Sequence, residues 1–260
     1  MRKLKPIYKI IFTAIGVAIY IILALSFSTS KAYQKRCRSI KVEILDSNIN
    51  MFVSAKDVNI ILAKNELNVM GYPVKKINSL IIEKEIEKHP SIEIAHVYGN
   101  VKGSINVRIK QRTPIVRIMP DKGSGYYIDS KGKLMPLSSN YTARVIPVTG
   151  YIDRSLKDFR TENLQSVQSD TLLRQIFLLA NCIIKDKYWS AVCDQIFIKK
   201  NNDIVLIPKI GAKKILLSSN GNYLKDLKTL TTFYKEVLPV IGWEKYKSIN
   251  LQYNKQIVCK

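Results

Sequence analysis

An uncharged apolar run near the N-terminus limits what this chain can fold into more than any other feature. Ile10–Phe27 contains no charged residue, and as a helix it would span ~27 Å, close to the thickness of a bilayer core. A cleaved signal peptide is the alternative, with Ala24-Leu25-Ser26 as its cleavage site, but the apolar region of a signal peptide usually runs only ~7–15 residues. The sequence therefore predicts a transmembrane helix over residues 10–30, behind a short head of residues 1–9.

The orientation of this helix depends on the long remainder of the chain. Four basic residues precede the apolar run and four follow it closely, so the positive-inside count is tied. Long C-terminal domains are translocated largely regardless of charge. We therefore expect a single-pass protein of the cytoplasmic (inner) membrane, with its N-terminus cytoplasmic and its C-terminal part periplasmic or otherwise extracytoplasmic.

The net charge of +22, from 42 basic and 20 acidic residues, suggests contact with nucleic acid, a lipid surface or an acidic partner. Eight of the basic residues lie within positions 1–38, which contain no acidic residue, so the remainder carries +14. A nucleic-acid binder would interleave basic residues with exposed aromatic residues on one surface. The basic residues here are dispersed, so we expect attraction to lipid headgroups and no nucleic-acid partner.

Residues 38–113 show the pattern strand, helix, helix, strand, strand. Apolar residues alternate in Ser39–Leu45 and again in Ile105–Lys110, as in half-buried strands. Ser54 and Asp57 form a capping box at the start of the first helix, Asn78 or Ser79 begins the second, and Pro90 ends it. Ile92–Tyr98 is the second of the three strands along the sequence of this β-α-α-β-β unit.

Residues 114–260 alternate strand patterns with two helical ones, which gives the chain the α+β class. Asp129 and Gly132 indicate a tight turn after one strand, and Val145–Gly150 is a further short strand. The two helices are expected over Asp170–Asp186 and Asn222–Leu238. We expect further strands over Gln195–Lys200 and Asp203–Ile207 around an asparagine turn, and over Lys213–Leu217, Ser248–Tyr253 and Gln256–Cys259.

The ordered set of motifs resembles the FtsQ/DivIB family of bacterial cell-division proteins. The residues that carry the resemblance are these: Phe52-Val53-Ser54, His89-Pro90, Gln111-Arg112-Thr113-Pro114, Tyr127-Ile128-Asp129-Ser130-Lys131-Gly132, Ile146-Pro147-Val148-Thr149-Gly150 and Asn250-Leu251-Gln252-Tyr253. Gln111 departs from the acidic residue that is usual there. The resemblance implies a cytoplasmic head, one membrane helix, a POTRA domain over 38–113 and a mixed β domain over 114–260.

Residue patterns typical of a catalytic site are nearly absent from the sequence. The two histidines, His89 and His96, fall on a helix stop and a strand, and no grouped Cys/His spacing suggests a zinc site. Gly211-Ala212-Lys213-Lys214 lacks the first glycine and the Ser/Thr of a phosphate-binding loop. The sequence therefore predicts no enzyme activity, no cofactor, no metal and no small-molecule substrate.

The four cysteines leave two interpretations open. Cys182 and Cys193 form a disulfide in an oxidising compartment, or they stay buried thiols. Cys37 lies just after the expected membrane helix and Cys259 one residue from the end, and the sequence leaves their redox state open as well.

A protein without catalytic groups acts through its surfaces, and two sheet edges are candidates. One is the edge of the POTRA sheet, and the other is the C-terminal strand, a natural site for adding a partner strand. We predict that Tyr253, Gln256, Ile257 and Val258 bind a partner. By the family resemblance the partners are small bitopic proteins of the FtsB/DivIC and FtsL types, gathered at the division septum by a non-enzymatic scaffold. The alternative is a POTRA-containing chaperone or translocation component that handles outer-membrane polypeptides.

Overall fold

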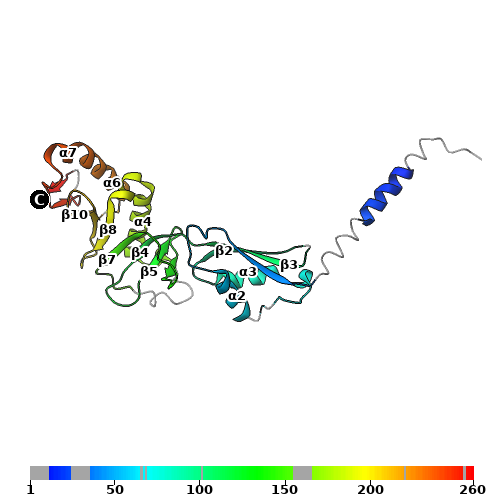
Figure 1. Cartoon of the computed structure of the whole chain (residues 1–260). Helices are drawn as coiled ribbons and strands as arrows, with labels where there is room; N and C mark the ends of the chain where they lie inside the picture. The colour runs from blue at the N-terminus through cyan, green and yellow to red at the C-terminus, as the bar shows by residue number, and fades with distance from the viewer. Residues whose placement is uncertain are drawn as a thin grey trace, which may run out of the picture. The chain divides into compact units, whose positions relative to one another are not determined.

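The computed structural model describes residues 12–24, 36–64, 67, 69–100, 102–154, 166–219, 221–253 and 256–260. The chain divides into two compact units, drawn in Figure 1. The first unit comprises Met1–Ser47 and Val53–Gln111, and the second comprises Asn48–Phe52 and Arg112–Lys260. The short segment Asn48–Phe52 therefore belongs to the second unit, although its neighbours in the sequence belong to the first.

The first described segment of the chain is a helix over residues 12–24, and its side chains are exposed. The membrane helix expected over residues 10–30 extends outside the described residues at both ends, and the head of residues 1–9 lies wholly outside them. Among the described residues, no helix has both the length and the apolar character that crossing a membrane requires.

The first unit confirms the predicted β-α-α-β-β order. Its elements are β1 (Ser39–Ile44), α2 (Ala55–Lys64), the 3-10 helix η1 (Val74–Lys76), α3 (Ser79–Glu87), β2 (Ile92–Gly99) and β3 (Ser104–Gln111). The sheet order is β1-β3-β2, with β3 parallel to β1 and antiparallel to β2. The two outer strands are therefore both sheet edges.

Local sequence signals explain why this unit folds as it does. The backbone N–H and hydroxyl of Ser54 donate to Asp57 Oδ2 at 2.8 and 2.7 Å, which is the predicted capping box of α2. Val107 and Ile109 of the central strand are fully buried. Gln111, at the position where the family usually has an acidic residue, is buried and accepts the Val53 N–H at 2.9 Å. Its side-chain Nε2 donates to Asp46 Oδ1 at 3.4 Å, so the side chain both accepts and donates, as a neutral amide can and a carboxylate cannot.

The second unit is built on a nine-stranded mixed sheet. Its strands are β4 (Pro114–Ile118), β5 (Tyr126–Asp129), β6 (Leu134–Pro136), β7 (Ile146–Gly150), β8 (Cys193–Ile198), β9 (Ile204–Pro208), β10 (Lys214–Leu216), β11 (Ser248–Asn250) and β12 (Val258–Cys259). The order is β12-β11-β10-β9-β8-β7-β4-β5-β6. The neighbouring pairs β4–β7, β7–β8 and β10–β11 are parallel, and the others are antiparallel.

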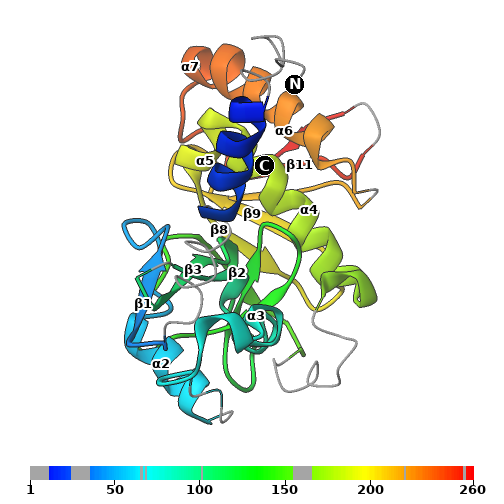
Figure 2. The same ribbon diagram turned by 90° about the vertical axis from the view of Figure 1, so that its right-hand side faces the viewer.

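The prediction of only two helices in this unit is wrong. The helical segments are the 3-10 helix η3 (Val167–Ser169), α4 (Thr171–Lys185), α5 (Lys187–Val192), α6 (Tyr223–Thr232), the π-helical turn η4 (Phe233–Val237) and α7 (Leu238–Ile241). Figure 2 shows α4, α5 and α6 beside the strands of this sheet. Their buried side chains and those of the sheet form one hydrophobic core.

Asp186 is the reason that α5 follows α4 so closely. It ends α4, and its carboxylate accepts the N–H groups of Tyr188 and Trp189, which begin α5. Trp189 is fully buried and donates its ring N–H to Thr231 Oγ1 at 2.8 Å. The segment Asn222–Leu238 is interrupted by η4, because Pro239 has no N–H to donate to the carbonyl four residues before it.

The two family motifs at the start of this unit meet at one buried ion pair. Asp129 Oδ1 accepts the N–H groups of Lys131 and Lys133, as predicted for a turn-forming residue. Its other oxygen accepts from Arg112 Nη1 at 2.9 Å. In the third motif Gly150 has φ 101°, and a side chain there would overlap the backbone of Ile198 on β8.

All four cysteines are free thiols. Of the two interpretations for Cys182 and Cys193, the structure has the unpaired one. Burial raises the pKa of the Cys193 thiol to about 12, so this side chain serves as an apolar packing group.

Candidate functional site

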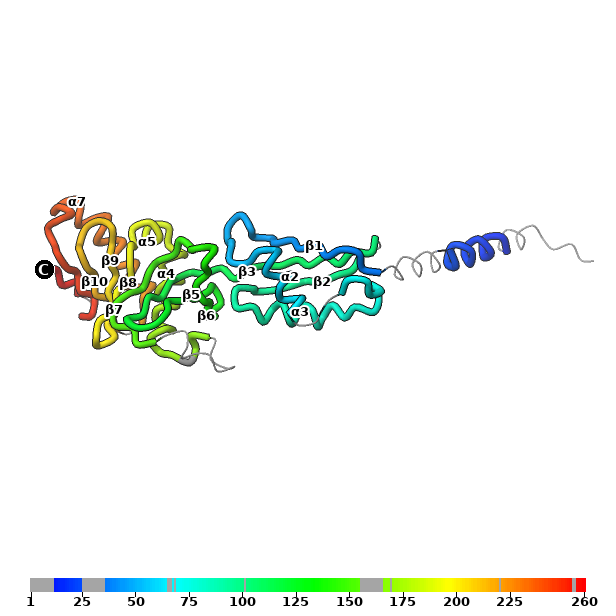
Figure 3. Tube along the Cα trace, turned by 60° about the horizontal axis from the view of Figure 1, so that its bottom comes forward, coloured from blue at the N-terminus to red at the C-terminus, as the bar shows by residue number. Residues whose placement is uncertain are grey.

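The C-terminal strand forms one edge of the nine-stranded sheet. The order places β12 outermost, next to β11, and the C-terminus lies near β10 in Figures 1 and 3. The strand is shorter than the sequence indicates: β11 ends at Asn250 rather than Tyr253, and β12 spans only Val258–Cys259 rather than Gln256–Cys259.

The four predicted partner-binding residues therefore differ in their setting. Only Val258 lies within β12, while Tyr253, Gln256 and Ile257 lie in the segment that leads to it. Tyr253 and Gln256 are exposed, and Ile257 and Val258 are half-buried. Ile257 packs against the hydrophobic core, and so does Cys259. Because side chains alternate along a strand, Val258 lies on the opposite face.

The hydrogen-bond pattern of β12 shows which backbone groups face the open side. Ser248 and Lys260 exchange both of their N–H···O=C bonds, each at 2.9 Å. Ile249 is opposite Cys259 in the register, and Asn250 is opposite Val258. In an antiparallel ladder the bonded and non-bonded pairs alternate, so Cys259 belongs to a non-bonded pair. The N–H and C=O of Cys259 consequently point away from β11, toward the open edge.

A cavity of about 580 Å³ adjoins this edge. Tyr253, Gln256 and Ile257 line it on one side, and residues of α6 line it on the other, among them Lys225 and Asp226. Asp226 is buried, and its Oδ2 accepts the backbone N–H of Ser218 at 2.9 Å, so it anchors the wall of the cavity. The sequence did not predict a role for Cys259 or for the α6 residues that line this cavity. The pairing of β12 with β11 and the packing of α6 beside this edge depend on residues far apart in the sequence, so neither leaves a local pattern.

The edge strand β2 of the first unit differs from β12, because a helix covers its backbone donors. The N–H of Ala95 donates to Glu87 Oε1 at 3.0 Å, and the N–H of Val97 donates to Glu83 Oε1 at 2.7 Å. These carboxylates project from α3 and occupy donors that an added strand would need. The edge strand β1 carries the exposed charged residues Lys41 and Glu43, which also oppose edge-to-edge pairing.

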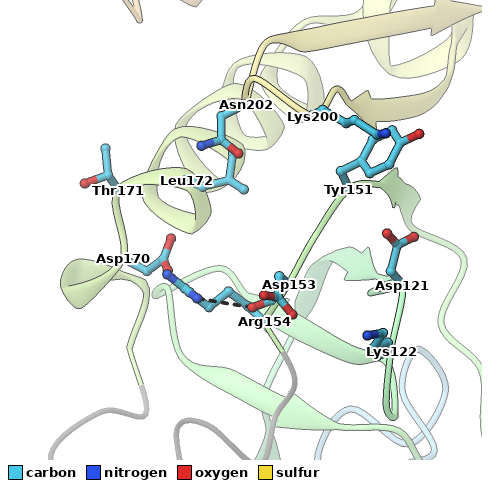
Figure 4. Close-up of a pocket in the computed structure, with 10 residues that line it drawn as sticks. All are labelled: Asp121, Lys122, Tyr151, Asp153, Arg154, Asp170, Thr171, Leu172, Lys200 and Asn202. Carbon is cyan, nitrogen blue, oxygen red and sulfur yellow. Dashed lines mark hydrogen bonds and ion pairs between the residues drawn. The ribbon is translucent and has the colours of Figure 1, made fainter.

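Another cavity, of about 830 Å³, lies elsewhere in the second unit and is shown in Figure 4. Its lining carries charged side chains of both signs, and two of the cations have partners within it. Arg154 Nε lies 2.8 Å from Asp170 Oδ2, and Lys200 Nζ lies 5.1 Å from the centre of the Tyr151 ring. Neither contact has the geometry of a nucleophile with its base, so we assign no chemistry to this cavity.

The histidines occupy structural positions. His89 Nδ1 accepts the N–H of Ser91 in the turn after α3, and burial lowers the pKa of its imidazole. His96 is exposed on β2. Across the described residues, no group of three or more His, Cys, Asp or Glu side chains is placed to hold a metal ion.

Comparisons with known proteins agree with this architecture. The family model described as "FtsQ/DivIB, C-terminal related" matches residues 113–260, and the model described as "POTRA-like domain" matches residues 35–110. The chain is also 23% identical over 198 residues to "Cell division protein FtsQ" of Salinibacter ruber (strain DSM 13855 / M31), an alignment that covers 73% of this chain and 72% of the relative. The chain therefore belongs to the FtsQ/DivIB family of cell-division proteins.

Proposed function

We propose that the chain is a non-enzymatic scaffold of the cell-division machinery that binds small bitopic partners of the FtsB/DivIC and FtsL types by strand addition at β12. The observation that carries this proposal is the open edge at Cys259, whose backbone N–H and C=O face away from the sheet. Main-chain hydrogen bonds to such an edge supply affinity, and neighbouring side chains supply selectivity.

The scaffold is held at the cytoplasmic membrane by one helix. The support is the uncharged segment Ile10–Phe27 with basic residues on both sides. In this arrangement residues 1–9 are cytoplasmic and both units are extracytoplasmic, at the division septum. A partner with its own single membrane helix is then restricted to the same surface, which raises its effective concentration near β12.

We place strand addition at β12 rather than at the sheet of the first unit because the two edges differ in whether their outward backbone N–H groups already have acceptors. Glu83 and Glu87 occupy two outward N–H groups of β2, whereas the outward N–H of Cys259 faces the open side of β12. A chaperone that captures unfolded chains by strand addition at its POTRA sheet would need the edge of β2 to be accessible. The capped edge thus favours the scaffold over the chaperone alternative.

Brief crosslinking in the cells of origin, followed by purification of the full-length protein and identification of its partners by mass, tests this function. We expect two small single-pass proteins with coiled-coil sequences. A chain that lacks Gln256–Lys260 should lose them while its second unit stays folded, which the fluorescence of Trp189 and Trp243 reports.

Two outcomes would contradict the proposal. Recovery of outer-membrane barrels or porin chains in place of the small bitopic proteins would favour the chaperone. Undiminished recovery of the bitopic proteins by the truncated chain would show that they bind another surface.

A further inference from the structure

Three segments that are far apart in the sequence meet at one end of the first unit, where the chain enters it. Cys37 donates its N–H to the carbonyl of Tyr72 at 2.8 Å, and Arg38 donates its N–H to the carbonyl of Gly103 at 2.8 Å. Gly99 lies directly against the side chain of Val74. We call this end the tip of the unit and define it by residues 36–39, 69–81, 97–100 and 102–105.

The tip is basic throughout. It exposes five cationic side chains, Arg36, Arg38, Lys75, Lys76 and Lys102, and these four ranges contain no acidic residue. Four acidic residues of the unit lie toward its other end, where β1 ends, α2 begins, α3 ends and β2 begins. Asp46, Asp57, Glu87 and Glu93 are there. Lysines such as Lys88 and Lys110 also lie at that end, so the tip is distinguished by carrying cationic side chains with no acidic residue in its four ranges.

Apolar side chains are exposed beside these cations. Met70, Tyr72, Leu80 and Ile81 are 46%, 61%, 65% and 52% exposed. A shallow groove of about 190 Å³ lies at this surface, and Lys76 lines it together with Tyr72 and Ile81. Apolar side chains framed by lysine and arginine are the composition of a surface that rests in the boundary between headgroups and acyl chains.

We propose that the tip docks on the anionic headgroups of the membrane in which the chain is anchored, with the exposed apolar side chains entering the interface. This inference rests on the proposed membrane anchor. The distance along the chain supports it, because the eleven residues 25–35 between the described helix and Arg36 reach at most roughly 40 Å when fully extended. This reach keeps the tip near the membrane. Where the facing leaflet contains anionic lipid, the attraction between its headgroups and each nearby lysine or arginine favours docking.

An acidic protein surface would also complement the cations, and the test distinguishes it from lipid. The full-length protein is reconstituted into discs of phosphatidylcholine alone and into discs in which about a third of the lipid is phosphatidylglycerol. A water-soluble acetylating reagent then modifies the lysines, and peptide masses give the rate at each one. Lys88 and Lys110, at the other end of the same unit, are internal controls.

We expect acetylation of Lys75 and Lys76 to be roughly fivefold slower in the anionic discs, with Lys88 and Lys110 unchanged. The triple variant R36Q/R38Q/K102Q should lose this protection. The matched variant K41Q/K88Q/K110Q removes the same charge from other parts of the unit and should keep it, with the protection again read at Lys75 and Lys76.

Each contrary outcome has a separate meaning. A chain that does not enter either type of disc overturns both the anchor and the docking. A chain that enters the discs with equal acetylation of both ends overturns the docking alone. Equal protection in neutral and anionic discs refutes headgroup recognition, and protection that appears only after an acidic protein is added assigns the tip to that protein.

Discussion

The buried ion pair between Asp129 and Arg112 provides the sharpest test of how the second unit is held together. The Asp129 side chain is 2% exposed and that of Arg112 is 18% exposed. Asp129 accepts three hydrogen bonds, from Arg112 at 2.9 Å, Lys131 N at 2.8 Å and Lys133 N at 2.7 Å. Replacing it by alanine leaves a largely buried guanidinium and two backbone donors without their acceptor.

The expected loss in the Asp129→Ala variant is about 3–5 kcal/mol of unfolding free energy, the usual cost of breaking a buried pair by removing one partner. Asp129→Asn should lose about half as much, because its amide oxygen still accepts the two backbone N–H groups. Asp153→Ala is the matched control. It is the same substitution at an exposed aspartate of the same unit, and its unfolding free energy should change by less than about 0.5 kcal/mol.

Urea denaturation of the full chain in detergent, followed by tryptophan fluorescence, measures this effect. Both tryptophans of the chain, Trp189 and Trp243, lie in the second unit, so the signal reports that unit alone. With a slope of about 2 kcal/mol per molar urea, the alanine variant should unfold at roughly 2 M lower urea. A loss below about 1 kcal/mol, or an asparagine variant as unstable as the alanine one, would refute the reasoning.

Three further outcomes are expected, each with its own measurement. Val107→Asp buries an unpaired carboxylate in the central strand of the first unit. The amides of that unit should therefore lose their protection from hydrogen exchange, while tryptophan fluorescence is unchanged. The control Val240→Asp, at a side chain that is 83% exposed, should leave both signals intact. The double variant Glu83→Ala/Glu87→Ala exposes two donors of β2, and sedimentation should detect more self-association than in the wild type. Burial raises the pKa of the Cys193 thiol from 9.0 to about 12, so in the unfolded chain this thiol loses its proton at a lower pH than in the folded one. The urea midpoint should therefore fall as the pH rises from 9 toward 12. In Cys193→Ala it should fall less steeply.

Features that depend on neighbours in the sequence could be predicted from it. The alternation of Val107 and Ile109, the capping box of Ser54 with Asp57 and the turn at Asp129 each involve residues within a few positions of one another, and the structure contains all three. Periodicity and capping act through the local backbone, so they are visible before the fold is known.

Features that depend on distant pairing could not be predicted. The run Gln256–Cys259 has the composition of a four-residue strand, but only Val258 and Cys259 find partners on the short β11. The six-residue helix α5 is too short for a periodic signal, and Trp189 is held by Thr231 across 42 positions. Glu83 and Glu87 have the helical spacing of a solvent-exposed face, and only the position of β2 gives them a role as caps.

The most direct test of the account is to remove a single backbone donor from the open edge. Cys259→Pro deletes the N–H that faces away from β11 and spares the bonds at Ser248, and proline is tolerated at such edge positions. Cys259→Ser keeps the N–H and removes only the thiol. The account predicts that, in detergent, the proline variant binds the copurified bitopic partners at least ~10-fold more weakly than the serine variant does, with equal urea midpoints. Equal affinity of the two variants would contradict strand addition at β12.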